Sequence, residues 1–242
     1  MRDSSKKLIN AFAAFMGVKV VSANWGPRGF AECFRRAKVN GFCPATIIDV
    51  GASDGRWTLE CINVFPSAQY FLIEPLEENR ERLNALAMSS SGIQVWHGAL
   101  GANSGSLPLN THGDQSSFLP SIEYPGEAHP VEVRTLDSFL ISNRYSAPFL
   151  LKADVQGYEL EVLKGAEHCL AHTEMLLLEV SFRRIYEGIP LAHEVISFIG
   201  NRGFRIYDIC SYVQRPGDGE LAQADIVFVR RESPLFAYEG WS

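Results

Sequence analysis

The fold is decided by the stretch Thr46-Ile-Ile-Asp-Val-Gly-Ala-Ser-Asp-Gly-Arg-Trp-Thr-Leu-Glu60. Its first five residues form a short apolar run that contains one acid, Asp49. The run breaks at a turn bounded by Gly51 and Gly55 and then reads as the start of a helix. A hydrophobic strand, a glycine turn and a helix make up the first unit of a doubly wound α/β domain. The two glycines lack a Cβ, so the turn can let its backbone approach a ligand closely.

The chemistry of the turn indicates which cofactor it would hold. It lacks the G-x-G-x-x-G pattern of dinucleotide-binding domains and carries acids at Asp49 and Asp54, which would repel a pyrophosphate and attract a cation. A second apolar run, 70–73, ends in Glu74-Pro75, where an acid can bind ribose hydroxyls. Pro75 predicts the start of a helix directly after this run. Together these features predict S-adenosylmethionine, a nucleoside that bears a sulfonium. The other interpretation is a plain strand-to-helix turn, with Glu74 at a solvated helix start.

Composition limits the alternatives. The chain has 242 residues, a net charge of −6 and a hydrophobic fraction of 46%, which predicts one domain, or one domain with a small addition. The negative charge argues against nucleic acid as a partner. The five cysteines are odd in number and form no C-x-x-C, which favours reduced thiols in the cytoplasm over a disulfide framework or a zinc site. No apolar run approaches the ~20 residues of a membrane span.

We predict that residues 1–45 form an N-terminal helical extension and that 46–242 form the cofactor-binding domain. Apolar residues of the segment 8–21 fall on one side of a helix, which predicts an amphipathic helix lying on the domain. The alternative is a secretion signal that ends near Val21-Ser-Ala23. The extension would serve as packing or as a contact in a homodimer, or it would cap the substrate.

The third apolar run, 93–96, exits as His97-Gly-Ala-Leu100. This exit would lie beside the first two strand tips, where an adenine ring would be sandwiched. Gly98 and Ala99 are small enough to leave room for it. His97 is either a contact on the adenine side or an ordinary surface histidine.

Residues 101–135 interrupt the β-α-β rhythm. The segments 105–110 and 131–134 read as strands separated by polar loops, and an insertion of this kind is a usual place for substrate recognition. We therefore predict a β-rich lid. The polar groups that it would present are His112, Asp114, Gln115, Ser116, Ser117 and Tyr124.

The later strands repeat the pattern of the first. The run 149–153 ends in Asp154-Val-Gln-Gly-Tyr-Glu159, and the run 175–178 ends in Glu179. Neighbouring strands that end in acids create a crevice at the topological switch point. The last two predicted strands, 204–208 and 224–229, are joined by a loop without a helix and should pair antiparallel. This ending is typical of methyltransferase sheets.

Five motifs now give the chain a family likeness, which runs from about residue 45 to about residue 230. They are Ile47-Ile-Asp-Val-Gly-Ala-Ser-Asp-Gly55, Glu74-Pro75, His97-Gly-Ala-Leu-Gly101, Thr135-Leu-Asp137 and Leu151-Lys-Ala-Asp-Val-Gln-Gly-Tyr-Glu-Leu-Glu-Val-Leu-Lys-Gly-Ala166. In this order they resemble FkbM-type methyltransferases, and the last motif is the most specific. The resemblance implies a class I methyltransferase fold, with a mostly parallel seven-stranded sheet whose last strand is antiparallel. It also implies O-methylation of a hydroxyl on a sugar, a glycan or a secondary metabolite.

The resemblance also assigns roles to residues. Asp49, Gly51 and Gly55 would surround the methionine end of the cofactor, Glu74 would bind the ribose, and Asp154 would face the reaction centre. Ser53-Asp54 departs mildly from the family pattern and leaves the turn intact. The complete set of predicted cofactor-binding residues is Asp49, Gly51, Ala52, Asp54, Gly55, Glu74, Pro75, Gly98, Ala99 and Asp154.

An alcohol acceptor has to lose its proton during methyl transfer, so a general base is expected. Asp154 is the first candidate, followed by Glu179 and His97. A divalent ion held by Asp154 and Glu179 is conceivable, but no third ligand is evident, so we expect no catalytic metal. Competing interpretations are an N-methyltransferase on the same scaffold, an NAD-using oxidoreductase and a non-catalytic binding protein. Acids at three strand tips argue against the last.

Overall fold

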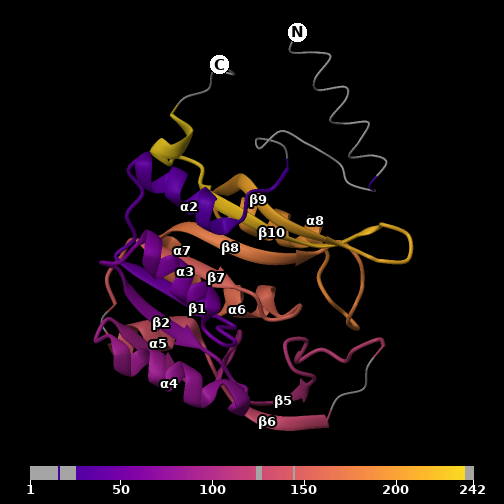
Figure 1. Ribbon diagram of the computed structural model, residues 1–242. Helices are drawn as coiled ribbons and strands as arrows, with labels where there is room; N and C mark the ends of the chain where they lie inside the picture. The colour runs from indigo at the N-terminus through magenta and orange to yellow at the C-terminus, as the bar shows by residue number, and fades with distance from the viewer. Residues whose placement is uncertain (1–15, 17–25, 124–126, 144, 238–242) are drawn as a thin grey trace.

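A computed structural model of the chain describes residues 16, 26–123, 127–143 and 145–237 (Figure 1). Most of the segment 8–21, for which we weighed an amphipathic helix against a secretion signal, lies outside the described residues, and so does Tyr124 of the predicted lid. No helix in the described ranges is long and apolar enough to cross a membrane.

The centre of the molecule is a seven-stranded sheet in the order β3-β2-β1-β7-β8-β10-β9 (Figure 1). Its strands are β1 (Thr46–Val50), β2 (Gln69–Ile73), β3 (Ile93–Trp96), β7 (Phe149–Ala153), β8 (Thr173–Ser181), β9 (Phe204–Gln214) and β10 (Leu221–Arg230). The neighbouring strands β3, β2, β1, β7 and β8 are all parallel to one another, and β10 runs antiparallel to both of its neighbours, β8 and β9. The predicted sheet with a reversed last strand is therefore confirmed.

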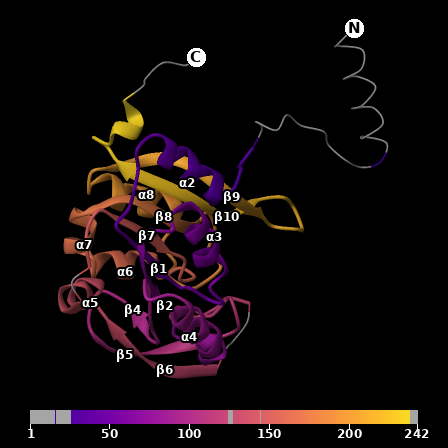
Figure 2. The same ribbon diagram turned by 60° about the vertical axis from the view of Figure 1, so that its left-hand side comes forward.

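Helices cover both faces of this sheet, as Figure 2 shows. One face is covered by α2 (Phe30–Val39), α3 (Arg56–Val64) and α4 (Arg80–Ser89), and the other by α5 (Leu136–Asn143), α6 (Glu159–Lys164), α7 (Glu167–Ala171) and α8 (Ala192–Gly200). Side chains alternate along a strand, so Ile47 of β1 packs into the first layer and Ile48 into the second. All five residues of β1 are buried, which explains its unbroken apolar run.

The predicted insertion, 101–135, forms a second, three-stranded sheet together with β4, which precedes it, in the order β4-β6-β5. It contains β4 (Ala99–Leu100), β5 (Gly105–Thr111) and β6 (Glu127–Arg134). β5 and β6 are antiparallel, whereas β4 and β6 are parallel. In both ribbon views β5 and β6 lie at one end of the molecule, beyond β2 (Figures 1 and 2).

One element boundary differs from our expectation. We predicted a helix start at Pro75, but α4 begins only at Arg80, after a single 3-10 turn, η1 (Glu77–Asn79). The side chain of Glu74 explains the delay, because its Oε1 accepts a 2.9 Å hydrogen bond from the amide of Leu76. Leu76 is consequently held in an extended conformation, with φ −74° and ψ 127°. A second short 3-10 turn, η2 (Pro234–Phe236), follows β10.

Candidate active site

A cavity of about 310 Å³ lies where β1, β2 and β7 end, under the loops of the insertion. The residues that line it come from the β1 turn, the ends of β2 and β7, the β3–β4 connection and the insertion. They include eight of the predicted site residues: Gly51, Ala52, Asp54, Glu74, Pro75, Gly98, Ala99 and Asp154. The sheet topology thus brings together in one place motifs that are up to about a hundred residues apart.

The β1 turn can be this tight only because residue 51 is a glycine. Gly51 has φ +75°, and a Cβ on it would lie 1.9 Å from the backbone oxygen of Asp154. The amides of Gly51 and Ala52 both donate to the backbone oxygen of Ile73, at 3.0 and 3.1 Å. The turns that follow β1 and β7 are therefore packed directly against each other at the wall of the cavity.

Glu74 ends β2 and is only 4% exposed, although it lines the cavity. Its two carboxylate oxygens accept hydrogen bonds from the amides of Ser53 (2.8 Å) and Leu76 (2.9 Å). Burial raises the pKa of Glu74, and these amide bonds only partly offset that effect. The side chain of Asn79 gives a third hydrogen bond, so of the roughly four acceptor sites on the two oxygens one remains for a ligand hydroxyl.

Asp49 does not line the cavity; it is fully buried beneath the turn. Its carboxylate accepts from the Oγ1 of Thr58 at 2.6 Å and pairs with the Nζ of Lys152 at 3.0 Å. Burial opposes the charged form of Lys152, but the carboxylates of Asp49 and Asp154 outweigh it and raise the pKa of the ammonium. Lys152 also donates to the backbone oxygen of Gly51 at 2.5 Å, so one cation supports both turns.

Lys152 was not among the predicted site residues, yet it lines the cavity. The only sequence signal for it is a lysine inside an otherwise apolar strand. Asp54 is also paired: its carboxylate contacts Arg56 at 2.6 Å and Arg82 at 3.1 Å. Burial opposes its ionisation, but the hydrogen bonds from Arg56 lower the pKa of Asp54. Two of the acids expected to attract a cation are therefore already compensated.

Asp154 and Glu179 are joined by a side chain that the sequence did not single out. The amide nitrogen of Gln156 donates to both carboxylates, at 3.1 Å in each case. Glu179 accepts a second bond from the side chain of Gln223, at 2.7 Å. The Nζ of Lys152 lies 3.8 Å from the other oxygen of Asp154.

The acids near Gln156 include two whose pKa is raised, Glu179 and Glu159. Burial, followed by the charges of Asp154, Glu159 and Asp225, raises the pKa of Glu179 to about 9. Burial likewise raises the pKa of Glu159 to about 7. Glu159 accepts from the amides of Val155 and Gly157, so its carboxylate holds the loop that follows β7.

His97 and Gly55 lie outside the lining of the cavity as far as the described residues define it. The Nε2 of His97 is 2.8 Å from the Oδ1 of Asn84 on α4. Burial and the nearby Arg80 lower the pKa of His97. Gly55 has φ +80° and packs against two leucines of α4, so it shapes the start of α3.

Several hydrogen bonds fasten the insertion over the cavity. Asp114 accepts from the hydroxyl of Ser53 at 3.1 Å, which joins the insertion to the β1 turn. The hydroxyl of Ser117 donates to the backbone oxygen of Gln156 at 2.7 Å. Tyr186, in the loop after β8, donates to the backbone oxygen of Gln115 at 2.9 Å. Three loops of the main sheet therefore hold the predicted lid.

The strand order of the central sheet, with β10 antiparallel to both neighbours, is that of the class I methyltransferase fold. The chain belongs to the FkbM methyltransferase family, because the family model "Methyltransferase FkbM domain" matches residues 49–206. The matched residues include the turns after β1, β2 and β7. The resemblance seen in the sequence is thereby confirmed.

Two relatives and one solved structure illustrate the likeness. The chain is 26% identical over 168 residues to the 2-O-methyltransferase NoeI of Sinorhizobium fredii, covering 60% of this chain and 67% of that protein. It is 26% identical over 185 residues to the hexuronic acid methyltransferase AglP of Haloferax volcanii, covering 71% and 72%. The crystal structure of methyltransferase FkbM from Methylobacillus flagellatus KT has a TM-score of 0.52 and 18% identity, covering 83% of this chain. This chain spans about half of that structure, 48%, and the likeness shows the fold.

Proposed function

We propose that the protein transfers a methyl group to a hydroxyl of a sugar, a glycan or a related secondary metabolite. The observation that carries the proposal is the placement of the Asp154 carboxylate in the cavity wall, beside the turn that follows β1. The name of one relative, a 2-O-methyltransferase, supports transfer to a hydroxyl, and the name of the other, a hexuronic acid methyltransferase, supports a sugar acceptor.

The residues present fit the cofactor. Glu74 is a buried carboxylate at the end of β2 that keeps an acceptor site for a ribose hydroxyl. Gly51 and Ala52 bring their backbone to the cavity wall, and the small residues Gly98 and Ala99 leave space for the adenine ring. S-adenosylmethionine supplies an already activated methyl group, so the protein has mainly to align the acceptor and exclude water.

Among the three candidate bases, the geometry favours Asp154. Glu179 retains its proton at neutral pH, because its pKa is raised to about 9, and a protonated acid cannot accept a proton from the acceptor. His97 lies with Asn84, outside the residues described as lining the cavity. Asp154 would therefore accept the hydroxyl proton, while Lys152 and Gln156 fix the orientation of its carboxylate.

We also propose that catalysis needs no metal. The amide nitrogen of Gln156 donates to both Asp154 and Glu179, and thus takes the place between the two acids where a shared ion would bind. A cytoplasmic location is supported by the cysteines, since the structure describes all five and none of them forms a disulfide. The division of the chain near residue 46, the lid role of 101–135, the homodimer and the exclusion of nucleic acid stay predictions.

The test is a methyl-transfer screen with radiolabelled S-adenosylmethionine against neutral sugars, uronic acids, amino sugars and glycans. We expect label in a product whose methyl group survives alkaline hydrolysis, because an ether is stable to base and a methyl ester is not. An Asp154→Asn variant is the control for background transfer. Label on nitrogen would favour the N-methyltransferase alternative. If S-adenosylhomocysteine does not bind in calorimetry, the cofactor assignment is wrong.

A further inference from the structure

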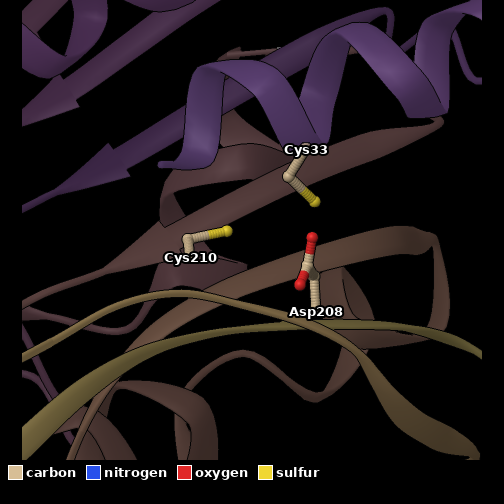
Figure 3. A group of neighbouring side chains, drawn as sticks. All are labelled: Cys33, Asp208 and Cys210. Carbon is tan, nitrogen blue, oxygen red and sulfur yellow. The ribbon is translucent and has the colours of Figure 1, made fainter. Parts of the chain in front are cut away.

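A second group of chemically active side chains lies far across the sheet from the cavity. Cys33 of α2 faces Asp208 and Cys210 of β9 (Figure 3). β9 is an edge strand of the main sheet, and the strands β7, β8 and β10 lie between it and β1. The two sulfurs and a carboxylate oxygen all lie within 4.8 Å of one another. None of these three described residues lines the cavity of the active site.

The donors converge although they come from distant parts of the chain. In Figure 3 the side chain of Cys33 points down from its helix toward those of Cys210 and Asp208. Cys33 is fully buried and Cys210 is 2% exposed, whereas the side chain of Asp208 is 31% exposed. The group is consequently closed on the side of the sulfurs and open to solvent at the carboxylate.

The surrounding charge suits a divalent cation. Arg36, one helical turn after Cys33, forms an ion pair with Asp208. Two thiolates, one carboxylate, the Arg36 guanidinium and a divalent cation sum to zero charge. Neutrality matters here because an uncompensated charge in a buried site is costly.

We propose that Cys33, Asp208 and Cys210 bind a thiophilic divalent cation such as Zn²⁺, which fastens α2 to the edge of the sheet. Two sulfur donors and one carboxylate oxygen match the ligands of zinc and do not match those of Mg²⁺ or Ca²⁺. Three protein ligands leave one tetrahedral position, which water would fill, and the partly exposed Asp208 gives water access to the group. Both thiols lose their protons to the buffer as the ion binds.

The cysteine spacing favoured free thiols over a zinc site, because these ligands follow none of the short spacings of zinc motifs. Cys33 and the Asp208-x-Cys210 pair meet only after β9 has been placed beside α2. A backbone hydrogen bond of 3.0 Å from the amide of Gly29 to the oxygen of Cys210 holds the two elements in register.

The proposal is tested on the full chain, stripped of metal under a non-thiol reductant, by titration with Cd²⁺ as a spectroscopic substitute for Zn²⁺. We expect one ion per chain, an ultraviolet thiolate-to-metal charge-transfer band, release of protons and a rise in Tm with Zn²⁺. Cys33→Ser and Cys210→Ser should each lose the band. Arg36→Gln keeps all three ligands and removes only the ion pair with Asp208, so it should weaken metal binding by about 10–100-fold.

Cys43→Ser is the matched control, because Cys43 is exposed and outside the group, and it should bind as the wild type does. Circular dichroism of each variant separates a lost ligand from a lost fold. The proposal is wrong if the reduced wild type gives no band, if the Cys33→Ser Cys210→Ser double variant keeps it, or if Cys43→Ser removes it. Since the readout is binding, the result does not depend on the acceptor or on methyl transfer.

Discussion

The Nζ of Lys152 lies 3.0 Å from a carboxylate oxygen of Asp49, and the two residues are direct partners in the register of the parallel strands β1 and β7. Both side chains are almost completely buried, at 7% and 0% exposure. The acid in the first motif is therefore neutralised from the neighbouring strand. Its position suits the support of the two turns better than attraction of a cationic cofactor.

Removing the lysine should leave a buried charge without a partner. We expect Lys152→Met to lower the free energy of unfolding by about 3–5 kcal/mol, the usual cost of breaking a buried pair. Denaturant unfolding measures the effect. The double variant Lys152→Met Asp49→Asn should recover part of the loss, because it also removes the stranded carboxylate.

The matched control for the Lys152→Met variant is Lys164→Met. Lys164 pairs with Glu161 at the surface, where the two side chains are 48% and 35% exposed. An exposed pair contributes only about 0–1 kcal/mol, so the control should unfold nearly as the wild type does. Equal losses in Lys152→Met and Lys164→Met would contradict the importance assigned to the buried pair.

Gly51 permits the contact between the two turns, and its replacement should disrupt them. In Gly51→Ala the new Cβ would meet the backbone oxygen of Asp154 at 1.9 Å, in a backbone conformation with φ +75°. We expect weaker binding of S-adenosylhomocysteine in calorimetry and a loss of stability of about 1–3 kcal/mol from strain alone. Gly105→Ala is the control, since nothing lies within 4 Å of its Cβ position. Wild-type affinity in Gly51→Ala would show that the turn can shift freely.

Glu74 should contribute to cofactor affinity through its carboxylate. We expect Glu74→Ala to weaken S-adenosylhomocysteine binding by about 1–3 kcal/mol, because a charge-assisted hydrogen bond is lost. Glu77→Ala, which removes an exposed acid paired with Arg80, should leave the affinity unchanged. If both variants bind alike in calorimetry, Glu74 does not touch the cofactor.

Particular residues show what the sequence could and could not reveal. Apolar runs bounded by glycines and acids predicted the strands, because burial on both faces leaves such runs without polar interruptions. The partners of Lys152 and Gln156 stayed hidden, because they depend on strand register and on how the insertion folds over the sheet. The start of α4 was misplaced for a similar reason: Glu74 holds Leu76 extended, and a proline alone does not reveal that bond.

Glu179 makes stability depend on pH. In the unfolded chain it ionises near its ordinary pKa of 4.5, whereas in the folded protein burial and neighbouring acids raise its pKa to about 9. Between these values the folded state binds the extra proton, so the free energy of unfolding falls as the pH rises. The contribution of Glu179 to the free energy of unfolding is constant below about pH 4.5 and is fully lost above about pH 9.

A Glu179→Gln variant has no proton to lose and can still accept from Gln156 and Gln223. Its stability should therefore fall less than that of the wild type between about pH 5 and pH 9, when denaturant unfolding is followed across that range. Glu78→Gln, at an exposed position, should keep the pH dependence of the wild type. Parallel profiles for Glu179→Gln and the wild type would show that Glu179 ionises as freely in the folded protein as in the unfolded chain.

Asp154→Asn tests the proposed base directly. The amide is nearly isosteric and can still accept from Gln156, but it cannot take the proton of an acceptor hydroxyl. We expect turnover to fall by about 10²–10⁴-fold, the usual contribution of general base catalysis, while the protein stays folded. Glu161→Gln, on the neighbouring helix, is the control and should retain turnover. Full activity in Asp154→Asn would show that Asp154 is not the base, and loss of cofactor binding without a change in turnover would leave Asp154 with a binding role alone.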